Sequence, residues 1–399
     1  MKYPIGIQNF EKMRNDGYVY VDKTALMYQL TSTGSYYFLG RPRRFGKSLL
    51  ISTLEAYFSG RRDLFEGLAV EKLEKDWVEY PILHVDLNTR NYDSVEALKA
   101  ELNKHLEIWE KRYGDEFKDR ALEERFFQII EKAYNKTGQR VVILVDEYDK
   151  PLLQAIGNEA LQDEYRIILK AFYSVLKTQD KYIRFAFLTG VTKFSKVSVF
   201  SDLNNLTDIS MSEEFQTICG ITDDEIHTYF EEPLNQLAAR YNTSYDEICR
   251  RLKENYDGYH FRKNGVDMYN PFSLLSTFRA NEFGSYWFET GTPTYLVKLL
   301  KDNNFCLPDL TEGEIASKSL NDVESMHDNP VSVIYQSGYL TIKDYDERFE
   351  NYRLGFPNKE VEEGFMQYLV PSYLPAKDNG STYFVANFVK DVEGGKPEQ

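Results

Sequence analysis

An apolar run over residues 141–145, VVILV, constrains the fold of this chain more than any other segment. The run is rich in β-branched residues and shows no alternation of apolar and polar positions. Strands of this kind lie in parallel sheets that are covered on both faces. Two acidic residues, Asp146 and Glu147, follow the run directly. The segment therefore predicts a central strand of an α/β domain, with carboxylates at its carboxyl end.

Three further apolar segments have the length of strands and alternate with helical patterns. The strand segments cover residues 36–39, 81–87 and 183–188, and helices are expected near residues 94–111, 117–135 and 158–177. This alternation is typical of βαβ units, whose strands are parallel and whose crossovers are right-handed. We therefore predict an α/β fold built on a parallel sheet.

The α/β rhythm ends near residue 215. Helical periodicity then continues near residues 222–241, 244–256, 271–277 and 292–301. Short apolar runs at residues 331–339, 341–343 and 352–357 predict a small β-containing piece, followed by a helix from Asn358. We expect three parts: an α/β core over residues 1–215, a helical lid over 216–330 and a small mixed C-terminal region over 331–399.

The loop after the first apolar strand ends in Gly46-Lys47-Ser48. This tripeptide is the distal half of the phosphate-binding pattern G-x-x-x-x-G-K-[ST]. A helix N-terminus binds phosphate oxygens through its free N–H groups and its partial positive charge. In this interpretation Lys47 reaches the β- and γ-phosphates and Ser48 presents its hydroxyl to Mg²⁺. Arg41 stands where the pattern has its first glycine, and Gly40 lies one residue too early, so the strict pattern fails at one position.

The loop residues are the candidate nucleotide ligands of this chain. Arg43 and Arg44 could contact phosphate, reach the nucleotide of a neighbouring subunit as an arginine finger, or form a surface ion pair. The predicted cofactor-binding residues are Arg41, Pro42, Arg43, Arg44, Phe45, Gly46, Lys47, Ser48 and Leu49.

The acidic pair after the buried strand supplies chemistry that complements the loop. In P-loop NTPases a carboxylate at this position holds Mg²⁺, and a neighbouring carboxylate can activate the attacking water as a general base. Asp146 is therefore a metal candidate together with Ser48, and Glu147 is the candidate base. Helix capping explains either carboxylate alone. The pair and the loop together favour a nucleotide site, because ligands of open α/β sheets bind at the carboxyl ends of strands.

The strand over residues 183–188 leads to a polar residue, Thr189. A further strand between the loop and the acidic pair, with Glu147 beside Asp146, indicates the additional-strand branch of P-loop ATPases. In that branch a polar residue on the next strand senses the γ-phosphate, so Thr189 joins Glu147 and Lys47 as a catalytic candidate. An ordinary turn or capping role for Thr189 is the alternative. Asp86 could support the metal from the second strand, although a structural role is favoured for it.

Composition limits the classes of function. The formal net charge of −15 argues against extensive nucleic-acid binding through phosphates, which usually needs a basic surface, but leaves room for a local basic groove. The three cysteines and five histidines are scattered, so neither a disulfide framework nor a zinc site is indicated. The sequence shows neither a signal peptide nor a membrane span. We expect a cytoplasmic protein without a membrane partner.

Several motifs extend over most of the chain: YVDKT from Tyr20, RPRRFGKS from Arg41, VDEYDKP from Val145 and YDGY from Tyr256. Further segments are YNPFS at residues 269–273, YW at 286–287, SGYL at 337–340 and FPNKEV at 356–361. Together these segments resemble the AAA-ATPase-like family of bacterial proteins. The loop of that family commonly begins R-P-R-R-F-G-K-S, so the resemblance makes Arg41 a family trait.

The resemblance implies a P-loop NTPase fold, ATP and Mg²⁺ as ligands, and ATP hydrolysis. Similar proteins usually continue into a PD-(D/E)XK nuclease domain, through which nucleic acid could be a partner. The last stretch of this sequence has no Asp followed by Glu-x-Lys after a strand, so we expect that nuclease domain to be absent. By the same analogy His260 or Arg262 of the lid could touch nucleotide, although core packing of this segment is favoured.

Two alternatives to an ATPase stay open at this point. A nucleotide switch would bind ATP or ADP tightly and turn over slowly, with the same residues. A non-enzymatic interaction domain would carry a vestigial loop, which the missing first glycine suggests. A small-molecule kinase fits less well, because Glu147 beside Asp146 suits a water nucleophile. The output of hydrolysis and the oligomeric state, including a homo-oligomer, are left open by the sequence.

Overall fold

The computed structural model describes residues 1–114, 118–193, 205–289, 314–320 and 330–373. Its centre is a parallel sheet of five strands, β1 (Tyr36–Gly40), β2 (Ile82–Asp86), β3 (Val141–Asp146), β4 (Ile183–Gly190) and β5 (Thr207–Asp208). The strand order is β2-β3-β4-β1-β5, and every neighbouring pair is parallel. The predicted α/β fold is therefore confirmed, with the arrangement of a P-loop NTPase.

The prediction that the inserted strand is the one between the loop and the acidic pair in sequence is wrong, because that strand, β2, lies at the edge of the sheet beyond β3. Strand β4 is the additional strand, because it separates the loop-bearing β1 from β3. Leu39 of β1 pairs with Thr189 of β4, and Asp86 of β2 pairs with Asp146 of β3. Parallel strands bring their carboxyl ends to one edge of the sheet. The loop, the acidic pair and Thr189 consequently meet at that edge.

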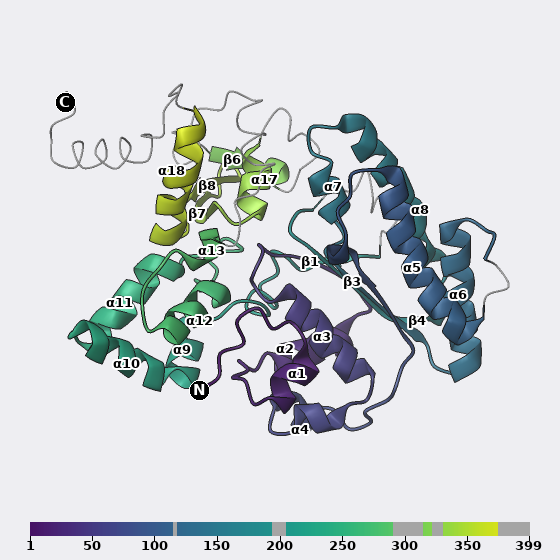
Figure 1. Ribbon diagram of the computed structural model, residues 1–399, viewed down its shortest axis with the longest axis horizontal. Coiled ribbons are helices and arrows are strands. Elements are labelled where there is room, and N and C mark those ends of the chain that lie inside the picture. Colours follow the sequence, from purple (N-terminus) through teal and green to yellow (C-terminus); the bar gives the residue numbers. More distant parts are fainter. Residues whose placement is uncertain (115–117, 194–204, 290–313, 321–329, 374–399) are drawn as a thin grey trace.

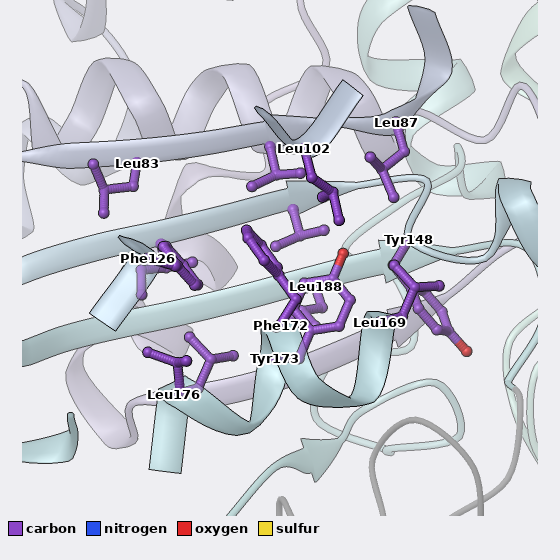
Figure 2. Close-up of a cluster of buried hydrophobic side chains, with 14 of the residues drawn as sticks. Leu83, Leu87, Leu102, Phe126, Tyr148, Leu169, Phe172, Tyr173, Leu176 and Leu188 are labelled. Atoms are coloured by element: carbon purple, nitrogen blue, oxygen red, sulfur yellow. The ribbon is translucent and has the colours of Figure 1, made fainter. Parts of the chain in front are cut away.

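Helices cover both faces of the sheet (Figure 1). The first half of the chain contains α1 (Phe10–Asn15), α2 (Thr24–Thr33), α3 (Lys47–Phe58), α4 (Ala69–Leu73), α5 (Val95–Tyr113), α6 (Leu122–Thr137), α7 (Lys150–Gln154) and α8 (Glu159–Thr178). Helices α5, α6 and α8 pack on one face, through the cluster that Figure 2 shows with Leu102, Phe126 and Phe172. Helices α1 to α4 pack on the other face. All six residues of β3 are buried, which explains the unbroken apolar run in its sequence.

A helical unit follows the sheet in sequence and lies beside it (Figure 1). It contains α9 (Asp223–Tyr229), α10 (Glu231–Tyr241), α11 (Tyr245–Tyr256), α12 (Pro271–Ala280) and α13 (Tyr286–Glu289). The helix expected over 222–241 is thus two helices, which meet at Phe230. Apolar residues of the N-terminal segment, among them Tyr3, Ile5 and Val21, pack against this unit. The helix expected over 292–301 lies outside the described residues.

The C-terminal part contains a three-stranded antiparallel sheet of order β6-β8-β7, packed on α17 (Val331–Gln336) and α18 (Lys359–Tyr373). Its strands are β6 (Glu314–Ala316), β7 (Thr341–Asp346) and β8 (Asn351–Gly355), and α16 (Ser317–Leu320) follows β6. The sheet therefore takes one strand from before residue 331. Residues 331–336, which read as part of a β-containing piece, form a helix that follows Pro330 and buries Ser332, Val333 and Ile334.

None of the helices in the described parts of the chain is long and apolar enough to cross a membrane.

Candidate functional site

The loop over residues 41–46 connects β1 to α3. The N–H of Arg41 donates to the carbonyl of Gly190, so the loop begins while the backbone is still in the sheet ladder. Two loop residues have left-handed backbones, Arg44 with φ 67° and Gly46 with φ 98°. Arg41 does not have a positive φ. The first position of the loop therefore needs no glycine, which explains why an arginine can stand there.

Lys47 is the first residue of α3 and is almost completely buried, with 3 % of its side chain exposed. Its Nζ donates to the carbonyls of Arg41 at 2.9 Å and Pro42 at 3.2 Å. The same nitrogen lies 3.8 Å from Oε1 of Glu147. The ammonium group is therefore held between the loop backbone and the carboxylate that follows β3.

Glu147 reaches the loop because its own backbone turns sharply after β3, with φ 54°. Burial raises the pKa of its carboxyl above the ordinary value, although Lys47 acts in the opposite direction. A carboxylate with a raised pKa beside an open cleft is suited to accept a proton.

Asp146 and Thr189 form a buried pair at the ends of β3 and β4. The hydroxyl of Thr189 donates to Oδ1 of Asp146 at 2.6 Å, and Thr189 is fully buried. The structure thus brings Thr189 against a carboxylate, where its hydroxyl orients Asp146. The side chain of Asp86 accepts from the N–H of Asn88 at 2.8 Å, which is a local turn.

A cleft of about 1080 Å³, measured out to its open mouth, lies between the loop, the N-terminal segment and α12. Of the predicted residues, Arg43, Arg44, Gly46, Lys47, Ser48, Leu49 and Glu147 line it. The side chains of Arg41 and Phe45 point elsewhere: Arg41 packs on Phe261, and Phe45 packs on Tyr259. Arg41 and Pro42 contribute to this site through their backbone carbonyls, which accept hydrogen bonds from Nζ of Lys47.

The two lid residues suggested by resemblance do not line the cleft. His260 contacts the carbonyl of Gly265 at 2.6 Å, and Arg262 pairs with Glu213 at 3.1 Å. The prediction that this segment packs in the core is confirmed for Tyr259 and Phe261, which are buried against Phe45.

Four contributions to the site were not found in the sequence. Residues 4–8 form part of the cleft wall, opposite Pro271, Phe272 and Leu275 of α12. Asn88 also lines the cleft and accepts from Nζ of Lys150 at 2.6 Å. The DEYDK motif gave a signal for Lys150 and Asp149, whereas the contributions of residues 4–8 and Asn88 arise from long-range packing.

Asp149 is the fourth contribution and is fully buried. Its Oδ2 accepts from the N–H of Thr192 at 2.6 Å and from the hydroxyl of that residue at 2.7 Å. Burial raises the pKa of this carboxyl. Asp149 therefore fastens the chain after β4 to the segment that carries Glu147.

Among the described residues, no group of three or more His, Cys, Asp or Glu side chains could hold a metal ion by itself. A divalent cation at this edge of the sheet would need ligand oxygens in addition to those of the protein.

Two comparisons with known proteins bear on this site. The model of a family described as predicted AAA-ATPase matches residues 4–200, which include the loop, the acidic pair and Thr189. The chain is also 40% identical, over 378 residues, to a protein of Azotobacter chroococcum mcd 1 named "Uncharacterized protein in vnfD 5'region". That alignment covers 94% of this chain and 71% of the relative.

Proposed function

The chain belongs to the predicted AAA-ATPase family, and from this premise we propose that it binds ATP in the cleft and hydrolyses it with Mg²⁺. The observation that carries the proposal is the position of Lys47 and Glu147, which face each other across 3.8 Å at the N-terminus of α3. A buried cation and a carboxylate of raised pKa at a helix N-terminus are suited to phosphoryl transfer to water.

The residues that line the cleft suggest where each part of a nucleotide would bind. The N–H groups at the start of α3 and the Lys47 ammonium would bind phosphate oxygens. The guanidinium of Arg44 is at the same cleft and would add a further phosphate contact. Apolar side chains of Pro4, Ile5 and Leu275 would receive the base, because they line the cleft beyond the loop.

The residues present also suit Mg²⁺. Ser48, the second residue of α3, and Asp146 would supply a hydroxyl and a carboxylate, which are oxygen ligands that this ion accepts. Thr189 would keep Asp146 oriented through the 2.6 Å hydrogen bond. When bound, the ion would neutralise charge on the phosphate oxygens.

The protein's own part in the reaction follows from its charges. Glu147 would take a proton from the water that attacks the γ-phosphate, since burial makes its carboxylate a better base than an exposed one. Lys47 and the loop N–H groups would stabilise the charge that develops on the phosphoryl oxygens. The raised pKa of Glu147 means that the base becomes active at a higher pH than an ordinary glutamate.

The variant Glu147→Gln tests this proposal. We expect turnover to fall by a factor of ~100 or more, while the dissociation constant for Mg-ATP stays within ~3-fold, because the base is lost and the phosphate contacts remain. Steady-state phosphate release and calorimetric titration measure the two quantities, and exposed Glu124→Gln serves as the matched control. Unchanged turnover in Glu147→Gln would remove Glu147 from the mechanism.

A slow nucleotide switch is the second candidate. It is supported by the hydrogen bonds of Lys47. Its Nζ already donates to two loop carbonyls, and a bound phosphate must replace these carbonyls as the acceptors. A low turnover number, together with nucleotide that co-purifies with the protein, would favour the switch. The same assay with added DNA or RNA tests coupling to nucleic acid, and sedimentation with and without ATP tests a homo-oligomer.

A further inference from the structure

The guanidinium of Arg41 is turned away from the cleft and is buried, with 1 % of the residue exposed. Its Nη1 donates to the carbonyls of Gly40 at 2.9 Å and Ser210 at 2.6 Å. Its Nη2 donates to the carbonyl of Gln216 at 3.3 Å, and its Cζ lies 4.0 Å from the ring centroid of Phe261. One side chain thus contacts the end of β1, the segment after β5 and the region that follows α11.

Arg41 forms no ion pair with any of the described residues, and burial lowers its pKa. A buried cation without a carboxylate is costly unless other groups replace its hydration. Here three carbonyl oxygens and one aromatic face replace most of it, while Nε of Arg41 has no hydrogen-bond partner among the described residues. The buried position of the Arg41 guanidinium therefore depends on all the segments that supply these carbonyls and the Phe261 ring.

The remaining residues of the loop show the same behaviour. We name residues 41–45 the docked segment, because each of its side chains contacts the second half of the chain. Arg43 lies over Trp287 at 4.7 Å, Arg44 over Phe272 at 4.8 Å, and Phe45 lies 4.7 Å from Tyr259. A Cβ on Gly338 would come within 2.6 Å of Pro42, which shows how closely these two residues pack.

The partners of the docked segment are themselves connected. The buried carboxylate of Glu360 on α18 accepts from the hydroxyl of Ser273 at 2.7 Å and from the N–H of Trp287 at 2.8 Å. The N–H of His260 donates to the hydroxyl of Thr341 at 2.6 Å. The helical unit and the small antiparallel sheet therefore present one surface to the loop.

We propose that Arg41 is a positioning residue, whose guanidinium fastens the start of the phosphate loop to the segment after β5 and to Phe261, and so orients the carbonyl that accepts Lys47. The inference rests on the proposed function, since it gives Arg41 a role in shaping the phosphate site. Arg41 is then more than a tolerated substitute for glycine. Restoring the glycine of the usual pattern weakens the site instead of improving it.

Variants Arg41→Gly, Arg41→Lys and Phe261→Leu test the proposal, with exposed Arg62→Ala as the matched control. We expect Arg41→Gly to weaken Mg-ATP binding by ~10-fold or more, Arg41→Lys and Phe261→Leu by ~3-fold, and the control to bind like the wild type. Titration with a fluorescent ATP analogue measures affinity. Hydrogen exchange of residues 41–48 without nucleotide measures the loop itself, and exchange should become faster in the three variants.

The hydrogen-exchange measurement keeps this inference separate from the proposed function. If the wild type does not bind ATP, the proposed function fails, yet the exchange of the loop still reports whether Arg41 holds it. If Arg41→Gly abolishes folding, the affinity and the loop exchange of Arg41→Lys and Phe261→Leu test the proposal in its place. Affinity equal to or tighter than the wild type in Arg41→Gly, or unchanged loop exchange in the conservative pair, overturns the proposal.

Discussion

The two parts of the proposed phosphate loop differ in what their side chains contact, although Arg43 and Arg44 of the first part also line the cleft. The side chains of the docked segment, residues 41–45, contact aromatic residues and Gly338 of the second half of the chain. Residues 46–49, which we name the cleft segment, all line the cleft. A loop of this pattern usually obtains its shape from glycines, which allow tight turns. In this chain residues 41–45 are held by tertiary contacts instead, and under the proposed function residues 46–49 would present Lys47 and Ser48 to the nucleotide.

The comparison predicts that variants in the two segments fail in different ways. A variant in the cleft segment should remove a ligand contact first and disturb the loop second. A variant at the docked surface should change the stability or mobility of the loop first and affinity second.

Lys47→Ala should give the largest effect of the cleft segment. We expect Mg-ATP affinity to fall by a factor of ~100 or more, because a buried ammonium beside the phosphate site is lost. Calorimetric titration measures the loss, and exposed Lys72→Ala is the control. Lys47→Ala also removes the hydrogen bonds to the carbonyls of Arg41 and Pro42, so hydrogen exchange of residues 41–45 without nucleotide should become somewhat faster, but less than in Arg41→Gly. Exchange as fast as in Arg41→Gly would break the distinction between the two segments.

Asp257→Asn tests the surface on which the docked segment packs. Asp257 directly follows α11 and lies two residues before Tyr259. Its Oδ1 has no hydrogen-bond partner among the described residues, and burial raises the pKa of its carboxyl from 3.8 to about 7. The folded state therefore binds more protons than the unfolded state, so stability falls as pH rises from about 4 to about 7.

We expect Asp257→Asn to remove this dependence and to change the difference in unfolding free energy between pH 5 and pH 8 by about 2 kcal/mol. Urea unfolding at the two pH values measures the effect, and exposed Asp119→Asn is the control. A pH dependence that is identical in wild type and variant would show that another group titrates.

Arg44→Ala should give the smallest effect and sharpens the boundary between the segments. Arg44 belongs to the docked segment through Phe272, but it is exposed and also lines the cleft. We expect ~5-fold weaker ATP binding and a small change in melting temperature, because an exposed cation–π contact contributes about 0.5–1 kcal/mol. Titration and thermal unfolding measure both. A loss of affinity as large as that of Lys47→Ala, with an unchanged melting temperature, would move Arg44 fully into the cleft segment.

The sequence predicted the parts of the fold that depend on local patterns. The buried run of β3, the helix N-terminus at Lys47 and the alternation of strands and helices follow from periodicity and composition. The position of Glu147 opposite Lys47 follows from the rule that strand ends meet at one edge.

Other features depend on contacts that no local pattern records. The sequence placed Arg41 among the nucleotide ligands, but its direction depends on Phe261, about 220 residues later. The wall formed by residues 4–8 requires α12 to pack beside the N-terminus. The pattern of residues 331–336 predicts part of a β-containing piece, but they form helix α17, whose buried Val333 and Ile334 pack among residues distant in sequence.

The N-terminal wall of the cleft has a practical consequence for work with this protein. Pro4 and Ile5 line the cleft, whereas Met1 is 61 % exposed. A purification tag fused ahead of Met1 would therefore begin within a few residues of the cleft mouth, and a charged or histidine-rich tag could compete with a phosphorylated ligand. Affinities are best measured after such a tag has been cleaved, and a tagged sample compared with a cleaved one reports how close the N-terminus lies to the bound ligand.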